Sequence, residues 1–297
     1  MKLKSFILSF IFTAVICNSL NAQTNYGTGY NDISEDAYNN LQVSVVTYNG
    51  TKPQTFTNWQ STIVPEVGNQ GQEDACNAWG LGYACMTITA AMQNNYSIYD
   101  ANGEMSGMKV FSPAFLYNSL NGGQDNGTNI LDMLEFVKTV GAVPWDYMPY
   151  VNGQYNVTPP ESLKTIAANY RIKDYARINM DEESIKSHLL SGYPVVIALN
   201  AYKGMGADGD AAYKNNTPYF FPEYASASDA EGRHCVCIIG YDDTIQTPYG
   251  NGAFLVQNSW GTQWGTNGRF FIPYDVFTKN IPGTNDPYIV HGFVVSM

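Results

Sequence analysis

At 297 residues, with 44% hydrophobic and 14% aromatic side chains, the chain is long enough for a leader and one catalytic unit of two packed lobes. Its formal net charge of -11 argues against nucleic acid or an anionic membrane surface as a partner, because neutralising phosphates requires clustered lysines and arginines. Solubility accounts for this acidity, so the charge decides little about mechanism.

The first 22 residues have the pattern of a secretory signal peptide. Lys2 and Lys4 precede a strongly apolar run that continues to Ile16, and small and polar residues follow as far as Ala22. The apolar run is short for a membrane span, and no later segment is longer and equally apolar. Cys17 is a poor site for lipid attachment because the residue before it is not small. We therefore expect a secreted protein, extracellular or periplasmic, without a membrane span.

The remainder divides into a polar, Gly- and Asn-rich lead-in segment, residues 23–52, and one domain, residues 53–297. In the first half of that domain, helix formers and apolar side chains on all sides predict a buried helix. Asp74 is a suitable N-cap for this helix and places Cys76 in its first turn. The predicted helices cover residues 75–92, 129–140, 160–170 and 181–190.

After Gly192 the sequence changes to short apolar runs separated by turn residues, which predict strands. A helical half followed by a half made of strands indicates an α+β protein of two lobes, with a cleft at their interface. The predicted strands cover residues 195–199, 234–241, 253–257, 269–272 and 289–295.

Four cysteines remain once the leader is removed: Cys76, Cys85, Cys235 and Cys237. Cys235 and Cys237 are two residues apart, so they share one face of a strand and fit small buried side chains better than a bridge to each other. Cys85 reaches one of them only if its helix packs against that strand, and this question stays open.

A cysteine is a useful nucleophile as the thiolate, which a helix N-terminus and a neighbouring imidazolium both favour. Three histidines are available to Cys76. His188 on a predicted helix and His291 near the C-terminus fit surface or structural roles, whereas His234 begins an apolar strand that would hold a base rigidly. Asn258 ends the next strand, where it is able to fix the tautomer of that base. Taken singly, each of these residues also fits ordinary packing or a turn.

Three segments resemble those of papain-like cysteine peptidases. The nucleophile segment, in which a Gln lies six residues before the Cys, is matched by NQGQEDACNAW at residues 69–79. The histidine strand is matched by RHCVCIIGYDD at residues 233–243, and the asparagine segment by NSWGTQWGTNGRFFI at residues 258–272. The likeness extends over nearly the whole span after Pro53 and keeps the order Cys, His, Asn.

This resemblance implies a papain-like two-lobe fold, with a helical N-terminal lobe, a β-barrel-like C-terminal lobe and the active site in the cleft between them. It implies a cysteine endopeptidase for protein or peptide substrates that forms a thioester acyl-enzyme and needs no cofactor or metal. We expect a monomer, although the sequence does not determine the oligomeric state. By similarity Cys76, His234 and Asn258 form its triad. The side-chain amide of Gln70 and the backbone N–H of Cys76 would donate to the oxyanion.

The same likeness indicates residues that bind substrate or shield the site. Trp260 would cover the histidine–asparagine hydrogen bond from water, although an aromatic residue there also fits ordinary core. Gly122 and Gly123 resemble the glycines whose backbone pairs with an extended substrate, and a simple turn explains them equally well. Ala198 is expected at one wall of a substrate pocket, by similarity only.

The chain also departs from the family pattern. Many members have a cysteine pair where Glu73 and Leu120 stand here, so we expect a fold built without that bridge. Asn77 replaces a tryptophan, and Arg233 replaces a small or acidic residue, which puts rate and substrate preference in question. The lead-in is far shorter than the usual inhibitory propeptide, which predicts weak autoinhibition at most.

Three other hypotheses compete with an active peptidase. The first is a catalytically silent papain-like domain that binds peptides or glycans outside the cell, although such a domain has no need to retain all four catalytic positions. The second is another Cys-His hydrolase, such as an amidase of cell-wall peptides, whose families lack the asparagine segment. The third is a metal site at His234, Cys235 and Cys237, which lacks a spaced second pair of ligands.

Overall fold

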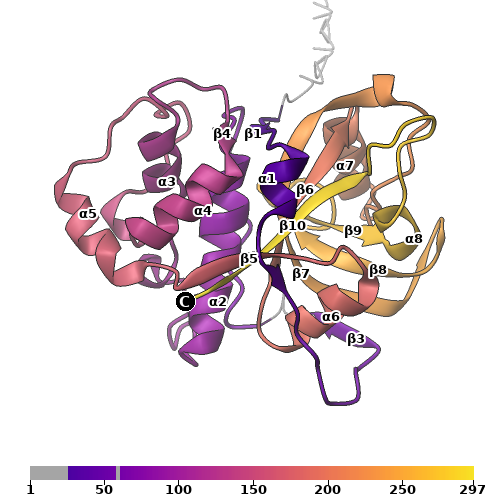
Figure 1. Cartoon of the computed structure of the whole chain (residues 1–297), viewed down its shortest axis with the longest axis horizontal. Helices are drawn as coiled ribbons and strands as arrows, with labels where there is room; N and C mark the ends of the chain where they lie inside the picture. The colour runs from indigo at the N-terminus through magenta and orange to yellow at the C-terminus, as the bar shows by residue number, and fades with distance from the viewer. Residues whose placement is uncertain (1–25, 58–60) are drawn as a thin grey trace, which may run out of the picture.

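The computed structural model describes residues 26–57 and 61–297. The predicted signal peptide, residues 1–22, lies outside the described residues. Helices gather in one lobe, and a mixed sheet with α-helices packed on it makes the other, with the lead-in segment running between them (Figure 1). The fold is therefore α+β with two lobes, as the sequence predicts.

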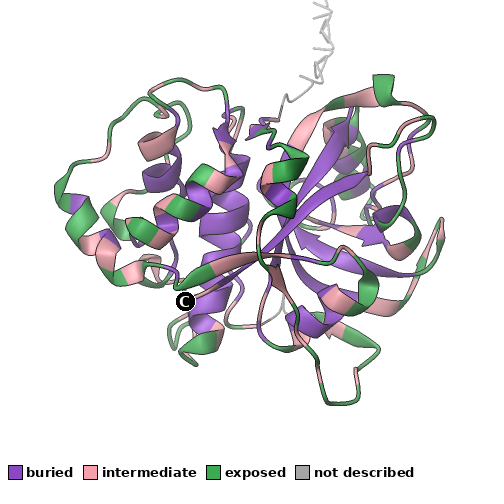
Figure 2. Ribbon diagram, in the orientation of Figure 1, coloured by how far each residue is buried: buried purple, intermediate pink, exposed green. Residues whose placement is uncertain are grey.

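The helical lobe is built around one long buried helix that begins at Cys76. Its first part is wound as a π-helix and every residue there is buried, in agreement with the apolar character of all its faces (Figure 2). Among the α-helices described in this lobe, the sequence analysis missed α3, a short helix that Ser112 caps and Pro113 begins. The elements of this lobe are η2 (Ala78–Met86), α2 (Thr87–Gln93), η3 (Gly107–Lys109), α3 (Pro113–Leu120), β4 (Thr128–Asn129), α4 (Ile130–Thr139), η4 (Trp145–Tyr147), α5 (Ser162–Ala167) and η5 (Ala168–Tyr170).

The second lobe contains the sheet, in the order β2-β5-β10-β6-β7-β8-β9, with β3 also paired to β7. All five predicted strands are present. Within the described chain β2 and β9 stay at opposite ends of the order, so the sheet is open and the barrel-like lobe is not a closed barrel. Its elements are β3 (Thr55–Thr57), β5 (Asp174–Ile178), α6 (Glu182–Leu190), β6 (Val195–Tyr202), α7 (Met205–Lys214), η6 (Ala227–Asp229), β7 (Ala230–Thr247), β8 (Gly250–Gln257), β9 (Arg269–Pro273), α8 (Tyr274–Phe277) and β10 (Ile289–Ser296).

Both faces of the central strands are covered. Alternate residues of β6 belong to two different cores: Val196 and Ala198 face the helical lobe, whereas Ile197 and Leu199 face the core of the second lobe. All eight residues of β6 are consequently buried. The sheet thus forms a wall against which the long helix packs, and the interface between the lobes lies here.

The lead-in segment joins the two lobes. Its first strand, β1 (Tyr30–Asn31), pairs in parallel with β4 of the helical lobe. The helix α1 (Glu35–Asn39) then packs over β10, and β2 (Val43–Ser44) extends the sheet beside β5. In Figure 1 this segment is the indigo ribbon between the helices and the sheet. Residues 26–44 are therefore part of the folded structure.

Candidate active site

Cys76 is the first residue of the long helix, and its side chain is fully buried. The prediction that Asp74 caps this helix is wrong. Among the described residues, its carboxylate accepts a hydrogen bond of 3.1 Å from the backbone N–H of Thr28, which lies in the lead-in segment. The backbone N–H of Asp74 donates in turn to the carboxylate of Asp125, at 2.8 Å. The Asp74 carboxylate therefore accepts from the backbone of the lead-in and not from the first turn of the helix.

His234 and Asn258 lie side by side because β7 and β8 are antiparallel neighbours. The imidazole Nε2 is 2.7 Å from the Asn258 Oδ1, and both residues are buried. An amide oxygen accepts only, so this bond places a proton on Nε2 and leaves Nδ1 free to act as a base. The Trp260 indole stacks on the imidazole with ring centroids 4.6 Å apart and keeps water from that bond.

Burial determines the protonation of the cysteine and the histidine in this state. It raises the pKa of the Cys76 thiol well above its usual value, while a backbone hydrogen bond from Cys235 opposes the rise. Burial also lowers the pKa of His234 to about 4, against the effect of its bond to Asn258. Both shifts favour the uncharged forms, a neutral thiol and a neutral imidazole.

Two hydrogen-bond donors converge on one peptide carbonyl. The backbone N–H of Cys76 and the side-chain Nε2 of Gln70 lie 3.1 Å and 3.3 Å from the carbonyl oxygen of Thr28. The Gln70 amide is held in place by Ser259, whose hydroxyl donates to its Oε1 at 2.5 Å. The sequence analysis missed Ser259, although it stands between Asn258 and Trp260 in the most specific matching segment.

The lead-in segment fills the space in front of these donors. The backbone N–H of Gly27 donates to the Gly71 carbonyl at 3.0 Å, and the indole N–H of Trp260 donates to the Gly27 carbonyl at 2.9 Å. On the other side, the N–H of Thr128 donates to the Gly29 carbonyl at 3.0 Å. The segment therefore crosses the whole cleft and places a peptide bond at the candidate nucleophile.

Glycine is required at two positions of the lead-in because its backbone touches the nucleophile loop. A Cβ at Gly27 would lie 2.0 Å from the Glu73 carbonyl oxygen, and one at Gly29 would lie 1.9 Å from that of Asp74. Gly29 also has a φ of 103°, which side chains rarely tolerate. The Gly-Thr-Gly run of the lead-in was the signal for this contact, and the sequence analysis did not use it.

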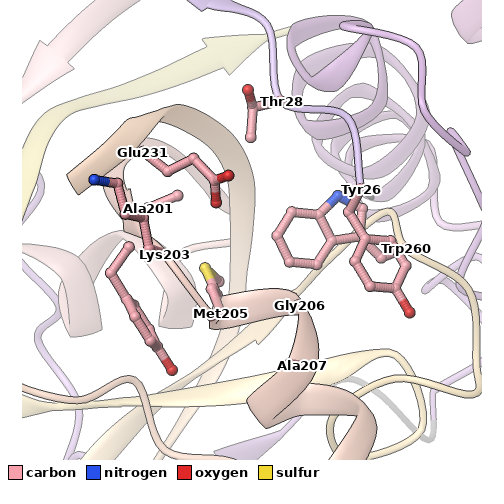
Figure 3. Close-up of a pocket in the computed structure, with 11 residues that line it drawn as sticks. Tyr26, Thr28, Ala201, Lys203, Met205, Gly206, Ala207, Glu231 and Trp260 are labelled. Atoms are coloured by element: carbon pink, nitrogen blue, oxygen red, sulfur yellow. The ribbon is translucent and has the colours of Figure 1, made fainter. Parts of the chain in front are cut away.

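A cavity of about 280 Å³ remains beside the lead-in on the sheet side of the cleft. Figure 3 shows Tyr26 against the Trp260 indole at one side of this cavity and Glu231 at the other. The two rings stack with centroids 4.8 Å apart, and the Tyr26 hydroxyl donates to the Asp210 carboxylate at 2.5 Å. A cavity thus adjoins the candidate site beside the lead-in segment.

The remaining residues predicted to bind substrate differ in burial: two glycines lie in an open turn, and Ala198 is buried. Gly122 and Gly123 form a turn with φ of 63° and 77°, and a Cβ on either would meet nothing within 4 Å. The lead-in forms its strand pairing with Thr128 instead, five residues after this turn. Ala198 is fully buried in β6, directly opposite Cys235 on β7.

A carboxylate stands where many related chains have a cysteine. Glu73 is buried, and it accepts hydrogen bonds from the Tyr150 hydroxyl and from the backbone N–H of Gly153. The same hydroxyl lies 3.0 Å from the carbonyl oxygen of Gln70. Burial raises the pKa of Glu73, and these hydrogen bonds oppose the rise. Glu73 therefore ties residues 150–153 to the nucleophile loop without a covalent bond.

The four described cysteines are all free and buried, with Cys85 next to Cys237.

The two histidines other than His234 are also buried, so a surface role for either is wrong. His188 lies between the Ser184 carbonyl and the Ser44 hydroxyl, in a structural position. His291 lies under the lead-in segment.

Curated proteins with similar sequences are peptidases by their descriptions. An uncharacterized peptidase C1-like protein of Acanthamoeba polyphaga mimivirus is 26% identical over 215 residues, which cover 69% of this chain and 63% of that one. Cathepsin O of Mus musculus is 30% identical over 120 residues, covering 40% of this chain and 32% of its own. The chain thus spans less than two thirds of the length of these relatives.

Solved structures share the fold. The cysteine protease xylellain from Xylella fastidiosa superimposes with a TM-score of 0.70 at 22% identity, covering 94% of this chain and 98% of that one. Digestive procathepsin L 3 of Tenebrio molitor larval midgut gives a TM-score of 0.62 at 18% identity, covering 93% and 77%. The sequence model described as papain family cysteine protease matches residues 52–281, which is most of the chain. The chain therefore belongs to the papain family of cysteine proteases.

Proposed function

We propose that this chain hydrolyses peptide bonds with Cys76 as nucleophile, His234 as its base and proton donor, and Asn258 as the group that orients His234. The observation that carries the proposal is the convergence of the Cys76 N–H and the Gln70 amide on one peptide carbonyl, that of Thr28. Donors arranged in this way stabilise the oxyanion of a tetrahedral intermediate. The carbonyl of Thr28 stands in for that of a substrate.

Four steps follow from these positions. The Cys76 thiol gives its proton to Nδ1 of His234, and the sulfur attacks the substrate carbonyl carbon, whose oxygen becomes the oxyanion. The imidazolium then protonates the leaving amine as the C–N bond breaks, which yields a thioester. Water, deprotonated by His234, attacks the thioester, and the carboxylic acid leaves as the thiol is restored. Asn258 keeps the ring in position throughout, because its Oδ1 holds the Nε2–H.

We propose an endopeptidase because the cleft holds a continuous chain. Tyr26 and Gly27 lie on one side of the two oxyanion donors, and Gly29 and Tyr30 lie on the other. A site of this form accepts the middle of a polypeptide. The leader pattern of residues 1–22 supports export from the cell. In the described chain we find no helix with both the length and the apolar character of a membrane span.

We further propose that the lead-in holds the enzyme in an inactive state until residues 26–31 leave the cleft. The donors, the indole N–H of Trp260 and the approach to Cys76 are all engaged by this segment. The sequence analysis predicted weak autoinhibition from the shortness of the lead-in. These contacts argue against that expectation, since six residues are enough to occupy the cleft.

The test uses an epoxide inhibitor selective for papain-like cysteines. Labelling, followed by peptide mapping, is compared for the intact chain, for the chain with Gly29→Ala, and for Gly29→Ala combined with Cys76→Ala. Gly29→Ala is meant to release the lead-in, and the chain that carries it is called the opened chain. We expect label at Cys76 in the opened chain and slower labelling of the intact chain. We also expect the opened chain to hydrolyse a peptide library, and Cys76→Ala to abolish that hydrolysis. The buried Cys85, Cys235 and Cys237 are internal controls for accessibility. A folded, opened chain without label or hydrolysis would favour the binding-module hypothesis.

A further inference from the structure

Tyr30 is a buried side chain that anchors the lead-in near the candidate nucleophile. It is 6% exposed, and it lies two residues beyond Thr28, whose carbonyl occupies the oxyanion donors. Its hydroxyl is 2.9 Å from Nδ1 of His291. The space that the buried phenol fills, called here the Tyr30 pocket, therefore ends at an imidazole.

The floor of this pocket consists of three side chains on adjacent strands. His291 on β10 is opposite Ala198 on β6, and Ala198 is opposite Cys235 on β7. Residues directly opposite in antiparallel strands face the same side of the sheet, so all three face the helical lobe. Cys235 follows His234 in the chain, and its backbone hydrogen-bonds the Cys76 thiol. The pocket is thus built into the same wall as the candidate site.

His291 is arranged to accept a hydrogen bond. Its ring is fully buried, and burial, together with Arg233, lowers its pKa to about 4, so it is neutral at neutral pH. Nε2 lies 3.6 Å from the Glu35 carboxylate and has no closer hydrogen-bond partner among the described residues. A carboxylate neighbour favours the proton on Nε2, which leaves the lone pair of Nδ1 facing the phenol. Nδ1 then accepts from the hydroxyl of Tyr30.

We propose that Tyr30 occupies a substrate side-chain pocket, and that His291 makes this pocket select a hydroxylated aromatic ring, that of tyrosine, over a plain aromatic ring. The proposal rests on the proposed function and names the substrate class of that site. Ala198 and Cys235 are small enough to leave room for a ring, and the buried imidazole penalises any ring that leaves its nitrogen unpaired. A polypeptide substrate that displaces the lead-in would place its own tyrosine where Tyr30 now lies.

The first experiment empties the pocket and refills it with the side chain alone. The full chain carries Cys76→Ala and Tyr30→Ala, and binding of p-cresol and toluene is measured by calorimetry. We expect p-cresol to bind about tenfold more tightly than toluene, the worth of one buried hydrogen bond. His291→Gln should keep part of this preference and His291→Phe should remove it. Tyr26→Ala, which vacates another tyrosine of the lead-in, is the matched control, and any preference there should not depend on His291.

The second experiment asks whether substrates use this pocket. In the chain opened by Gly29→Ala, each position of a peptide library is varied between Tyr and Phe. We expect one position to favour Tyr by about tenfold in kcat/KM, and that preference to disappear with His291→Phe. Equal binding of p-cresol and toluene, or binding of neither, would overturn the proposal. So would peptide hydrolysis without a preference for Tyr. Binding of p-cresol in a chain that hydrolyses no peptide would instead refute the proposed function.

Discussion

Replacing Gly29 with alanine should release the lead-in segment and activate the uncut chain. The glycine has a φ of 103°, and a Cβ there would lie 1.9 Å from the Asp74 carbonyl oxygen. The two backbones must therefore separate. Their separation weakens the bond from Thr28 N–H to the Asp74 carboxylate and the bond from Thr128 N–H to the Gly29 carbonyl.

The free-energy cost of Gly29→Ala to the docked state is the sum of the backbone strain and the hydrogen bonds lost. Holding a non-glycine residue in such a conformation costs about 1–3 kcal/mol. Each hydrogen bond lost contributes about 0.5–1.5 kcal/mol. The docked state should therefore lose at least about 2 kcal/mol relative to the open state, which shifts the equilibrium at least about thirtyfold. Since only the open state admits substrate, kcat/KM of the uncut chain should rise by the same factor.

The assay is hydrolysis of a fluorogenic peptide by uncut protein, with the chain length checked by mass spectrometry before and after. Gly103→Ala is the matched control, because Gly103 has a φ of 82° but a Cβ there would meet nothing within 4 Å. It should bear a similar backbone cost and leave activity unchanged. If Gly29→Ala is no more active than the unaltered chain while both fold and both bind the epoxide at the same rate, the lead-in does not control access.

Three further predictions concern the site and its supports. In the opened chain, Gln70→Ala should lower kcat about 10²–10³-fold by removing an oxyanion donor, whereas the exposed neighbour Gln72→Ala should have little effect on peptide hydrolysis. A double-mutant cycle of Glu73→Ala and Tyr150→Phe, measured by urea unfolding, should give a coupling free energy of about 1.5–3 kcal/mol, and additive effects would contradict the tie between them. Because burial raises the pKa of Cys76 in the closed state, its alkylation by iodoacetamide should still increase tenfold per pH unit through pH 9 in the intact chain, but level off at lower pH after Gly29→Ala.

The parts of the fold that follow local rules were predictable. The all-apolar helix that begins at Cys76 and the apolar runs that became β6 to β10 have the periodicity that identifies buried elements. The pairing of His234 with Asn258 was also predictable, because consecutive strands joined by a short turn usually pair. These predictions needed only the spacing of residues along the chain.

Contacts between distant parts of the sequence were not predictable in this way. Asp74 is a good N-cap by type, yet its carboxylate is used by Thr28, 46 positions away. His291 looked like a surface or structural residue because nothing near it in sequence reveals that Tyr30 meets it, 261 positions away. The lead-in was judged by its length, whereas in the structure a few of its atoms touch the two donors.

The hydrogen bonds of the Glu73 carboxylate have a practical consequence for work with reductants. Thiol peptidases require reductant to keep the nucleophile from oxidising, and reductant also attacks disulfides that hold a fold together. In the described chain the four cysteines are unpaired, and the nucleophile loop is held by Tyr150 and Gly153 through oxygen and nitrogen atoms alone. Concentrated dithiothreitol should therefore protect catalysis while leaving the melting temperature unchanged. Folding of the described residues should therefore not depend on an oxidant, since no disulfide among them has to form.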